Sequence, residues 1–246
     1  MIRRILSEEK RPFIDSIFIT VSLLFILFLA GMISVVVNIA SQVTFFVGFL
    51  FLSLILILFI SKNKKWNYYG FSFSKKNEIK RYYIYTPLFL LAFMPIFAGI
   101  SADLTIRKII YLISYMALVA FVEETIFRGI ILKMMLKKGL IIAIFWSSIL
   151  FSLSHLLNSL GTSNTISIIT QTSYAFVIGI ILSVIVIKTN NIFITILFHY
   201  LNNIMTSLNP EVENLLSTSI STIMFAMAVI YLIYLYSVYF SKKLST

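Results

Sequence analysis

Long apolar segments follow one another through most of this 246-residue chain, separated by short polar or basic stretches. A run of about 18 or more apolar residues is long enough to cross the hydrocarbon core of a bilayer as a helix. The composition agrees, since 60% of the residues are hydrophobic and only 12% are charged, against about 25% charged in a soluble domain. The alternating short segments of a transmembrane barrel are absent. The chain therefore reads as an all-α, polytopic membrane protein.

About eight transmembrane helices are expected, in a single integral membrane domain over residues 1–246. They fall at residues 13–37, 43–60, 82–100, 106–135, 140–157, 166–187, 192–208 and 219–240. Pro12 fits the first position of the first helix. Pro87 and Pro95 are expected to kink the third, because proline removes a backbone N–H from the helical ladder. Gly139 is expected to allow the chain to reverse after the fourth.

The basic residues are distributed unevenly among the loops. Seventeen of the 20 Lys and Arg residues lie on one side of the predicted bundle, and only Arg107 and Lys108 lie near helix ends on the other. The positive-inside rule then predicts a multi-pass protein of the cell membrane with both termini cytoplasmic. The net charge of +11 is therefore explained by membrane topology, and no nucleic-acid partner is expected.

The most basic loop, residues 61–81, carries seven Lys and Arg residues together with Trp66, Tyr68 and Tyr69. Tyr and Trp are enriched at the boundary between membrane and water. Basic juxtamembrane segments are attracted to anionic lipid. The loop is therefore expected to be a solvated cytoplasmic segment in contact with the bilayer, and the lipid bilayer is the first partner that the sequence implies.

Three charged residues, Glu123, Glu124 and Arg128, interrupt the fourth apolar segment. Each costs about 2.5–3.5 kcal/mol on insertion scales when it lies at the centre of a membrane helix. Glu124 and Arg128 are four residues apart, so they share a helix face and are expected to form an internal ion pair. Glu123 lies about 100° around the helix and needs a different partner.

The chain has two histidines, and each lies in an apolar segment. His155 follows Phe151 by four residues, and His199 precedes Asn203 by four. At a rise of about 1.5 Å per residue, Glu124, His155, His199 and Asn203 lie about 16–22 Å along their helices from the same end. Three separate helices thus carry their polar residues to a similar depth, near the middle of the membrane. This agreement predicts that they form one site.

A carboxylate and two imidazoles in a dry pocket suit hydrolysis. A carboxylate accepts a proton from water, and a His orients that water or carries the proton. A second His with an Asn donates hydrogen bonds to a developing oxyanion. A zinc ion held by Glu123, His155 and His199 is the alternative, because two His and a carboxylate leave one position open. The sequence does not decide between these two arrangements, and with no Cys it excludes a Cys nucleophile.

Several of these residues also have structural explanations. An ion pair explains why Glu124 and Arg128 are tolerated, whatever the chemistry. His155 and Asn203 are also residue types that hydrogen-bond between membrane helices. Phe151 is most simply a packing residue, and Asn202 is expected to face away from Asn203. Glu123, without a local partner, is the residue that these explanations leave out.

At these residues the chain resembles the CPBP family of intramembrane proteases, which includes the CAAX prenyl endopeptidases and the Abi, or bacteriocin-processing and immunity, proteins. The family carries EExxxR, FxxxH and HxxxN/D motifs on three helices. Here they correspond to Glu123-Glu124 with Arg128, Phe151 with His155, and His199 with Asn203. The resemblance covers roughly residues 105–208, which would be the catalytic core.

The resemblance implies a membrane-embedded endopeptidase that acts on membrane-associated proteins or peptides. Glu123 would activate the water with help from His155, and His199 and Asn203 would form the oxyanion hole. Glu124 and Arg128 would support the site. Two alternatives stay open: a non-catalytic bacteriocin-immunity or scaffold protein with the same fold, and a transporter that relays protons through its Glu and His residues.

Overall fold

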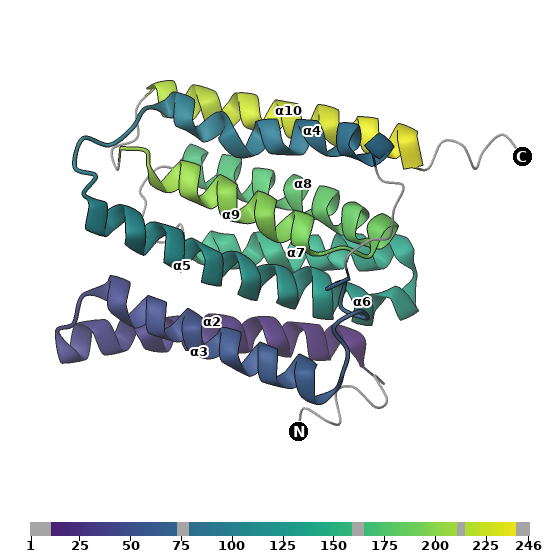
Figure 1. Cartoon of the computed structure of the whole chain (residues 1–246), viewed down its shortest axis with the longest axis horizontal. Helices are drawn as coiled ribbons and strands as arrows, with labels where there is room; N and C mark the ends of the chain where they lie inside the picture. The colour runs from purple at the N-terminus through teal and green to yellow at the C-terminus, as the bar shows by residue number, and fades with distance from the viewer. Residues whose placement is uncertain (1–10, 73–78, 159–164, 211–214, 240–246) are drawn as a thin grey trace, which may run out of the picture.

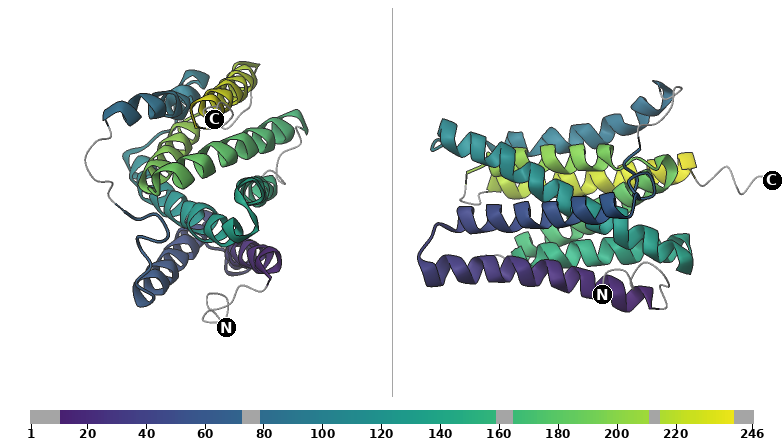
Figure 2. Two further views of the ribbon diagram at one scale, coloured as in Figure 1. Left: turned by 90° about the vertical axis from the view of Figure 1, so that its right-hand side faces the viewer. Right: turned by 60° about the horizontal axis from the view of Figure 1, so that its bottom comes forward.

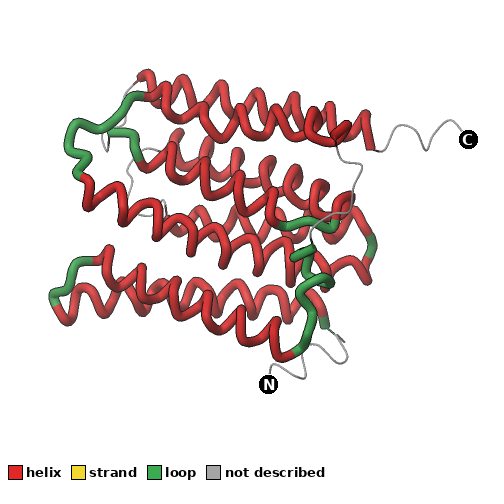
Figure 3. Tube along the Cα trace, in the orientation of Figure 1, coloured by secondary structure: helices red, strands yellow, loops and turns green. Residues whose placement is uncertain are grey.

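The computed structural model describes residues 11–72, 79–158, 165–210 and 215–239, and this part of the chain contains helices and turns but no strand (Figure 3). The helices are α2 (Pro12–Val37), α3 (Ser41–Lys62), α4 (Ile79–Phe93), the 3₁₀ helix η1 (Met94–Ala98), α5 (Ile106–Glu124), the π-helix η2 (Thr125–Ile131), α6 (Leu132–Met135), the 3₁₀ helix η3 (Leu136–Lys138), α7 (Leu140–Asn158), α8 (Thr165–Thr189), α9 (Phe193–Ser207) and α10 (Leu215–Tyr239). The all-α class is confirmed.

Five helical segments in this part of the chain are long and apolar enough to cross a membrane: Pro12–Val37, Ser41–Lys62, Ile106–Lys138, Ile168–Thr189 and Leu215–Tyr239. Ile84–Ala98 and Leu140–Leu156 are apolar but shorter, and α9 has 15 residues. A multi-pass membrane protein is thus confirmed, whereas the count of eight spans and the cytoplasmic placement of the termini stay predictions.

The helices run roughly side by side in one bundle (Figures 1 and 2). The α2–α3 hairpin lies along one edge and α4 and α10 along the opposite edge, with α5, α7, α8 and α9 between them (Figure 1). Many large apolar side chains of α2 and α3 are exposed on the bundle surface. Since 17% of the span window of α2 and 28% of that of α3 is buried inside the protein, lipid is the natural cover for the rest.

The bundle has two distinguishable ends. Lys62, Lys138 and Lys188 lie at or next to helix ends at one of them, which is called the basic end below. α2 begins and α10 ends at this same end (Figure 1). The N-terminal residues 1–10 and residues 240–246, which also contributed basic residues to the predicted topology, lie outside the described part of the chain.

The predicted helix starts and stops agree in part with the structure. Pro12 is the first residue of α2, and Gly139 ends the α5–η3 rod with φ +114°, a conformation that favours glycine. Near Pro95 the α-helix gives way to 3₁₀ geometry. At Pro87, by contrast, α4 continues without interruption, so the helix change expected there occurs only at Pro95.

The expectation of a solvated loop at residues 61–81 is wrong for Tyr69 and Gly70, which are buried, whereas Asn67 and Tyr68 are exposed as expected. Tyr69 is 1% exposed, and the backbone N–H of Ile192 donates to the Gly70 carbonyl at 2.9 Å. The Asn190 side-chain amide donates to the Asn67 carbonyl at 3.0 Å. Aromatic burial therefore draws this segment onto the α8–α9 turn. Residues 73–78 of the loop lie outside the described part of the chain.

Gly179 allows α7 and α8 to approach each other closely. A Cβ atom added at Gly179 would lie 2.9 Å from the Ser148 Cβ. We expect Gly179→Ala to lower the free energy of unfolding by about 1–3 kcal/mol, because an added methyl in a filled interface forces the backbones apart. Unfolding in mixed detergent micelles measures it. Gly48→Ala is the matched control, since its added Cβ meets Ala30 at an ordinary 3.6 Å; equal losses in both variants would refute the close approach.

Candidate active site

The Glu-Glu motif lies where the helical geometry of the chain changes. α5 ends at Glu124, and the π-helix η2 carries the next seven residues, Thr125–Ile131, all of them buried. The sequence predicts one uninterrupted α-helix here, so the π-helical segment is a departure from that expectation. Such wide turns are rare and frequently occur at functional sites. The rod as a whole still continues to Lys138, as the single long span requires.

Glu124 connects three helical elements through one carboxylate oxygen. Its Oε1 accepts from Arg128 Nη1 at 2.9 Å and from His199 Nδ1 at 3.0 Å. The side chains of Glu124 and Arg128 are both fully buried. The predicted ion pair of Glu124 and Arg128 is therefore confirmed. The contact to His199 is additional, and it makes Glu124 the residue that fixes the His199 ring.

Phe151 takes part in the same charged cluster. The guanidinium carbon of Arg128 lies 3.9 Å from the centre of the Phe151 ring, a distance at which a ring face attracts a cation. The Phe151 ring also packs edge-on to His199, with 5.7 Å between the ring centres. Phe151 is a packing residue, as expected, but it also stabilises the buried positive charge beside the Glu124 carboxylate.

A hydrogen bond at Nδ1 fixes the ring of each histidine. His155 Nδ1 donates to the Phe151 carbonyl at 3.0 Å, because a carbonyl oxygen only accepts. His199 Nδ1 donates to the Glu124 carboxylate for the same reason. A neutral imidazole with a protonated Nδ1 carries a lone pair on Nε2. Each ring is thus held through Nδ1 by a backbone or carboxylate partner.

Glu123 faces these rings. Its Oε2 lies 3.7 Å from His199 Nε2, which is too long for a direct hydrogen bond. The same oxygen is buried and has no hydrogen-bond partner among the described residues. One ligand atom from each of Glu123, His155 and His199 lies within 4.8 Å of the others. The structure thus brings together three residues from α5, α7 and α9 that the sequence expected to converge.

The three residues would also fit a metal ion. Catalytic zinc sites commonly have three protein ligands and one open position. Ligating histidines usually donate their second N–H to a carbonyl or carboxylate, as His155 and His199 do here. The unpartnered Glu123 oxygen supplies the carboxylate. The donor set therefore suits zinc, and it suits a bound water equally well.

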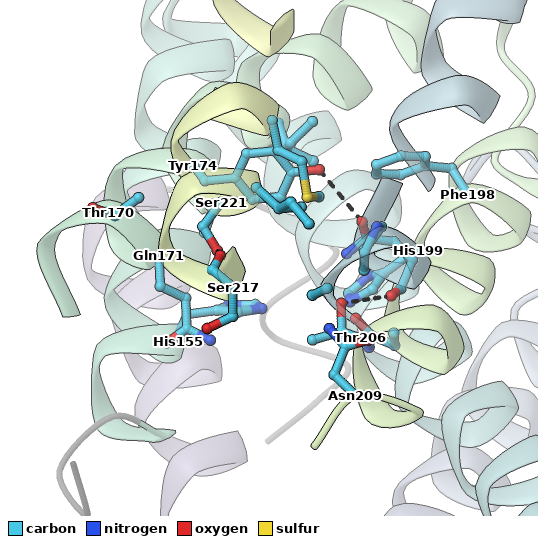
Figure 4. Close-up of a pocket in the computed structure, with 18 of the residues that line it drawn as sticks. His155, Thr170, Gln171, Tyr174, Phe198, His199, Thr206, Asn209, Ser217 and Ser221 are labelled. Carbon is cyan, nitrogen blue, oxygen red and sulfur yellow. Dashed lines mark hydrogen bonds between the residues drawn. The ribbon is translucent and has the colours of Figure 1, made fainter. Parts of the chain in front are cut away.

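A cavity of about 430 Å³ adjoins this cluster (Figure 4). His155 and His199 both line it, as does Asn203. Asn202, which was expected to face away from Asn203, lines it too, and it accepts a 3.4 Å hydrogen bond from the Tyr174 hydroxyl. That expectation is wrong, because a cavity this wide is bordered by neighbouring residues of α9 that lie about 100° apart.

Other polar residues of this cavity were missed by reasoning from the sequence. Thr170, Gln171 and Tyr174 of α8, Thr206 of α9, and Ser217, Thr218 and Ser221 of α10 all line it. The signal was available as polar residues at spacings of three and four in otherwise apolar segments.

A buried carboxylate and two imidazoles beside a cavity, inside a bundle of apolar helices, are the features expected of a membrane-embedded hydrolase. Residues 105–205 match the model of a family described as type II CAAX prenyl endopeptidase Rce1-like. This match covers less than half of the chain and agrees with the family resemblance drawn from the three motifs. The family that it describes consists of proteases of the lipid bilayer that act on peptide substrates. No curated protein and no solved structure matches the chain.

Proposed function

We propose that this protein is an intramembrane endopeptidase that hydrolyses peptide bonds of membrane-associated proteins or peptides. The observation that carries the proposal is the convergence of Glu123, His155 and His199 beside a cavity that α7, α8, α9 and α10 line. The family match favours this activity over the scaffold and transporter alternatives.

In the proposed reaction Glu123 accepts a proton from a water molecule, whose oxygen attacks the carbonyl carbon of the scissile bond. The lone pair on His155 Nε2 orients that water. The proton then passes from Glu123 to the leaving nitrogen as the C–N bond breaks, so the products are a carboxylic acid and an amine. Glu123 begins and ends the cycle as a carboxylate.

His199 and Asn203 are proposed to stabilise the oxyanion that develops on the carbonyl oxygen. Since His199 Nδ1 already donates to Glu124, donation to the oxyanion requires a second proton on Nε2. Such a doubly protonated ring would lie between the Glu123 and Glu124 carboxylates, 3.7 Å and 3.0 Å away. Glu124 and Arg128 then act as positioning residues for the ring.

A zinc ion held by Glu123, His155 and His199 would instead supply Lewis-acid activation, and the ring of His199 would then carry a single proton. Purified protein in lipid nanodiscs, incubated with candidate membrane peptides, tests the activity and the metal together. Loss of cleavage in the presence of a chelator and its return with Zn²⁺ would support the metal. Cleavage that a chelator leaves unchanged would support the glutamate mechanism. Absence of cleavage of every peptide would count against the proposed activity.

The cytoplasmic placement of both termini in the cell membrane is part of the proposal. Because the chain has no Cys, single cysteines report sidedness cleanly. Gln42 and Lys62 are exposed residues at opposite ends of α3. We expect a membrane-impermeant maleimide added to intact cells to label Gln42→Cys but not Lys62→Cys, because the basic end faces the cytoplasm. The reverse pattern would overturn the orientation, and labelling after permeabilisation is the control.

A further inference from the structure

Ser147 of α7 donates a hydrogen bond to the π-helix η2. Its hydroxyl oxygen lies 2.8 Å from the Phe127 carbonyl oxygen, and both side chains are fully buried. A Ser hydroxyl inside a helix can instead donate to a carbonyl of its own helix, three or four residues earlier. The neighbouring Ser148 does so, donating to the Ile144 carbonyl at 2.7 Å. Ser147 therefore differs from its neighbour in connecting two elements of the candidate active site.

The carbonyl that accepts from Ser147 belongs to a wide turn of η2. The Phe127 carbonyl also accepts from the backbone N–H of Leu132, five residues later. In an α-helix the donor to this oxygen would be Ile131, four residues later. A carbonyl oxygen has two lone pairs, so Leu132 and Ser147 together use both. The Ser147 hydroxyl thus attaches α7 to the oxygen that closes the wide turn.

Ser147, Phe151 and His155 recur every four residues along one face of α7. The Phe151 ring packs edge-on against the Phe127 ring, with 5.3 Å between the ring centres. A ligand atom of His155 lies within 4.8 Å of one of Glu123. This single face of α7 therefore meets the Glu-Glu motif segment at two places, the wide turn and the Glu123 carboxylate.

We propose that Ser147 is a positioning residue, whose hydrogen bond to Phe127 sets the distance between His155 and Glu123. Glu123 lies four residues before Phe127, and His155 lies eight residues after Ser147. At about 1.5 Å per residue, the bond joins the two elements within about 12 Å of each group along its helix. Ser147 is not among the described residues that line the cavity, so it acts through these groups. The inference rests on the proposed peptidase function.

Replacing Ser147 by Ala is expected to lower kcat about tenfold or more and to leave KM unchanged. The change shifts the groups that activate water, and a misplacement of about 1 Å costs up to about 100-fold in rate, whereas the cavity lining stays intact. Ser148→Ala is the matched control, because it removes an equally buried hydroxyl that is bonded within α7. We expect it to keep the wild-type kcat. Initial rates per folded molecule, on an apolar peptide of about 20 residues in nanodiscs, measure both constants.

Ser147→Thr separates positioning from packing, because it keeps the hydroxyl and adds a methyl group to a filled interface. We expect its kcat per folded molecule to exceed that of Ser147→Ala by about fivefold, whichever of the two variants is the more stable. Unfolding curves give the stability of each variant. Equal kcat values for Ser147→Thr and Ser147→Ala would overturn the positioning role. If Ser147→Thr does not fold, the comparison with Ser148→Ala and the exchange rates decide.

Hydrogen exchange tests the contact without any cleavage. We expect the backbone amides of residues 128–132 to exchange at least about fivefold faster in Ser147→Ala than in the wild type, because the wide turn loses its attachment to α7. Ser148→Ala should leave these rates unchanged. Mass spectrometry of peptides that cover residues 125–132, from protein in nanodiscs, gives the rates. Unchanged exchange in Ser147→Ala would overturn the inference.

The two kinds of measurement separate this inference from the peptidase function. Faster exchange in Ser147→Ala, without cleavage of any peptide by the wild-type protein, would refute the peptidase function and leave Ser147 as a purely structural contact. Cleavage by the wild-type protein, with the same kcat in Ser147→Ala and Ser148→Ala, would refute the positioning role and leave the peptidase standing.

Discussion

Replacing Glu123 by Gln is expected to lower kcat/KM for peptide cleavage by about 10³-fold or more, while the protein folds as before. The amide keeps the size and shape of the carboxylate but cannot accept the proton of the attacking water, and loss of a general base costs about 10²–10⁴-fold. Folding should be preserved because Glu123 has no partner at hydrogen-bond distance through its Oε2. Initial rates in nanodiscs, with unfolding curves for both proteins, measure the two quantities.

Asp103→Asn is the control for removal of a carboxylate, since Asp103 lies exposed in the turn before α5. We expect its activity to equal that of the wild type. His155→Ala should resemble Glu123→Gln in activity, because it removes the second group at the water. A folded Glu123→Gln variant with more than about a tenth of wild-type kcat/KM would rule out the role proposed for Glu123.

Replacing Glu124 by Gln is expected to destabilise the fold itself, by about 3–5 kcal/mol in the free energy of unfolding. The reason is that Arg128, fully buried and 2.9 Å from Glu124, would lose its anionic partner while staying in the bundle interior. His199 would also lose the carboxylate that holds its ring. Unfolding in mixed micelles at matched lipid content measures the difference in free energy of unfolding between the variant and the wild type. Activity should also fall, because the His199 ring is no longer held in place.

The double variant Glu124→Gln/Arg128→Met separates this charge effect from general damage at the site. Removal of both charges leaves no unpaired ion, so the double variant should be more stable than Glu124→Gln alone. Its activity should stay low, because His199 is still without its carboxylate. If the losses of stability caused by Glu124→Gln and by Arg128→Met simply add in the double variant, the two charges do not stabilise each other as a buried ion pair.

The sequence was most informative where the chemistry of the membrane leaves little choice. Apolar segments of 18 or more residues specify helices, and intramembrane charges have to meet. The pairing of Glu124 with Arg128 follows from their spacing alone. The convergence of Glu123, His155 and His199 followed from similar depths along three helices, and the structure places their ligand atoms within 4.8 Å of one another.

Features that depend on tertiary packing could not be predicted in this way. The π-helix at Thr125–Ile131 has no local sequence signature. It is an unfavourable local conformation that contacts with other parts of the bundle stabilise, and those contacts are not visible in the sequence. Tyr69 and Gly70 are buried against the α8–α9 turn, although the many basic residues of this loop predict that it is exposed to solvent. The sequence shows Gln171 and Tyr174 as polar residues in an apolar segment, but only the fold shows that they line the same cavity as the histidines.

Hydrolysis in H₂¹⁸O tests the central claim most directly. The wild-type protein in nanodiscs is incubated with an apolar peptide of about 20 residues, long enough to span the bilayer, and the products are analysed by mass spectrometry. We expect cleavage of the peptide, one ¹⁸O atom in the new C-terminal carboxylate, and no such product from Glu123→Gln. An equal yield of labelled product from Glu123→Gln, or an intact probe after incubation with the folded wild-type protein, would contradict an intramembrane peptidase that activates water through Glu123.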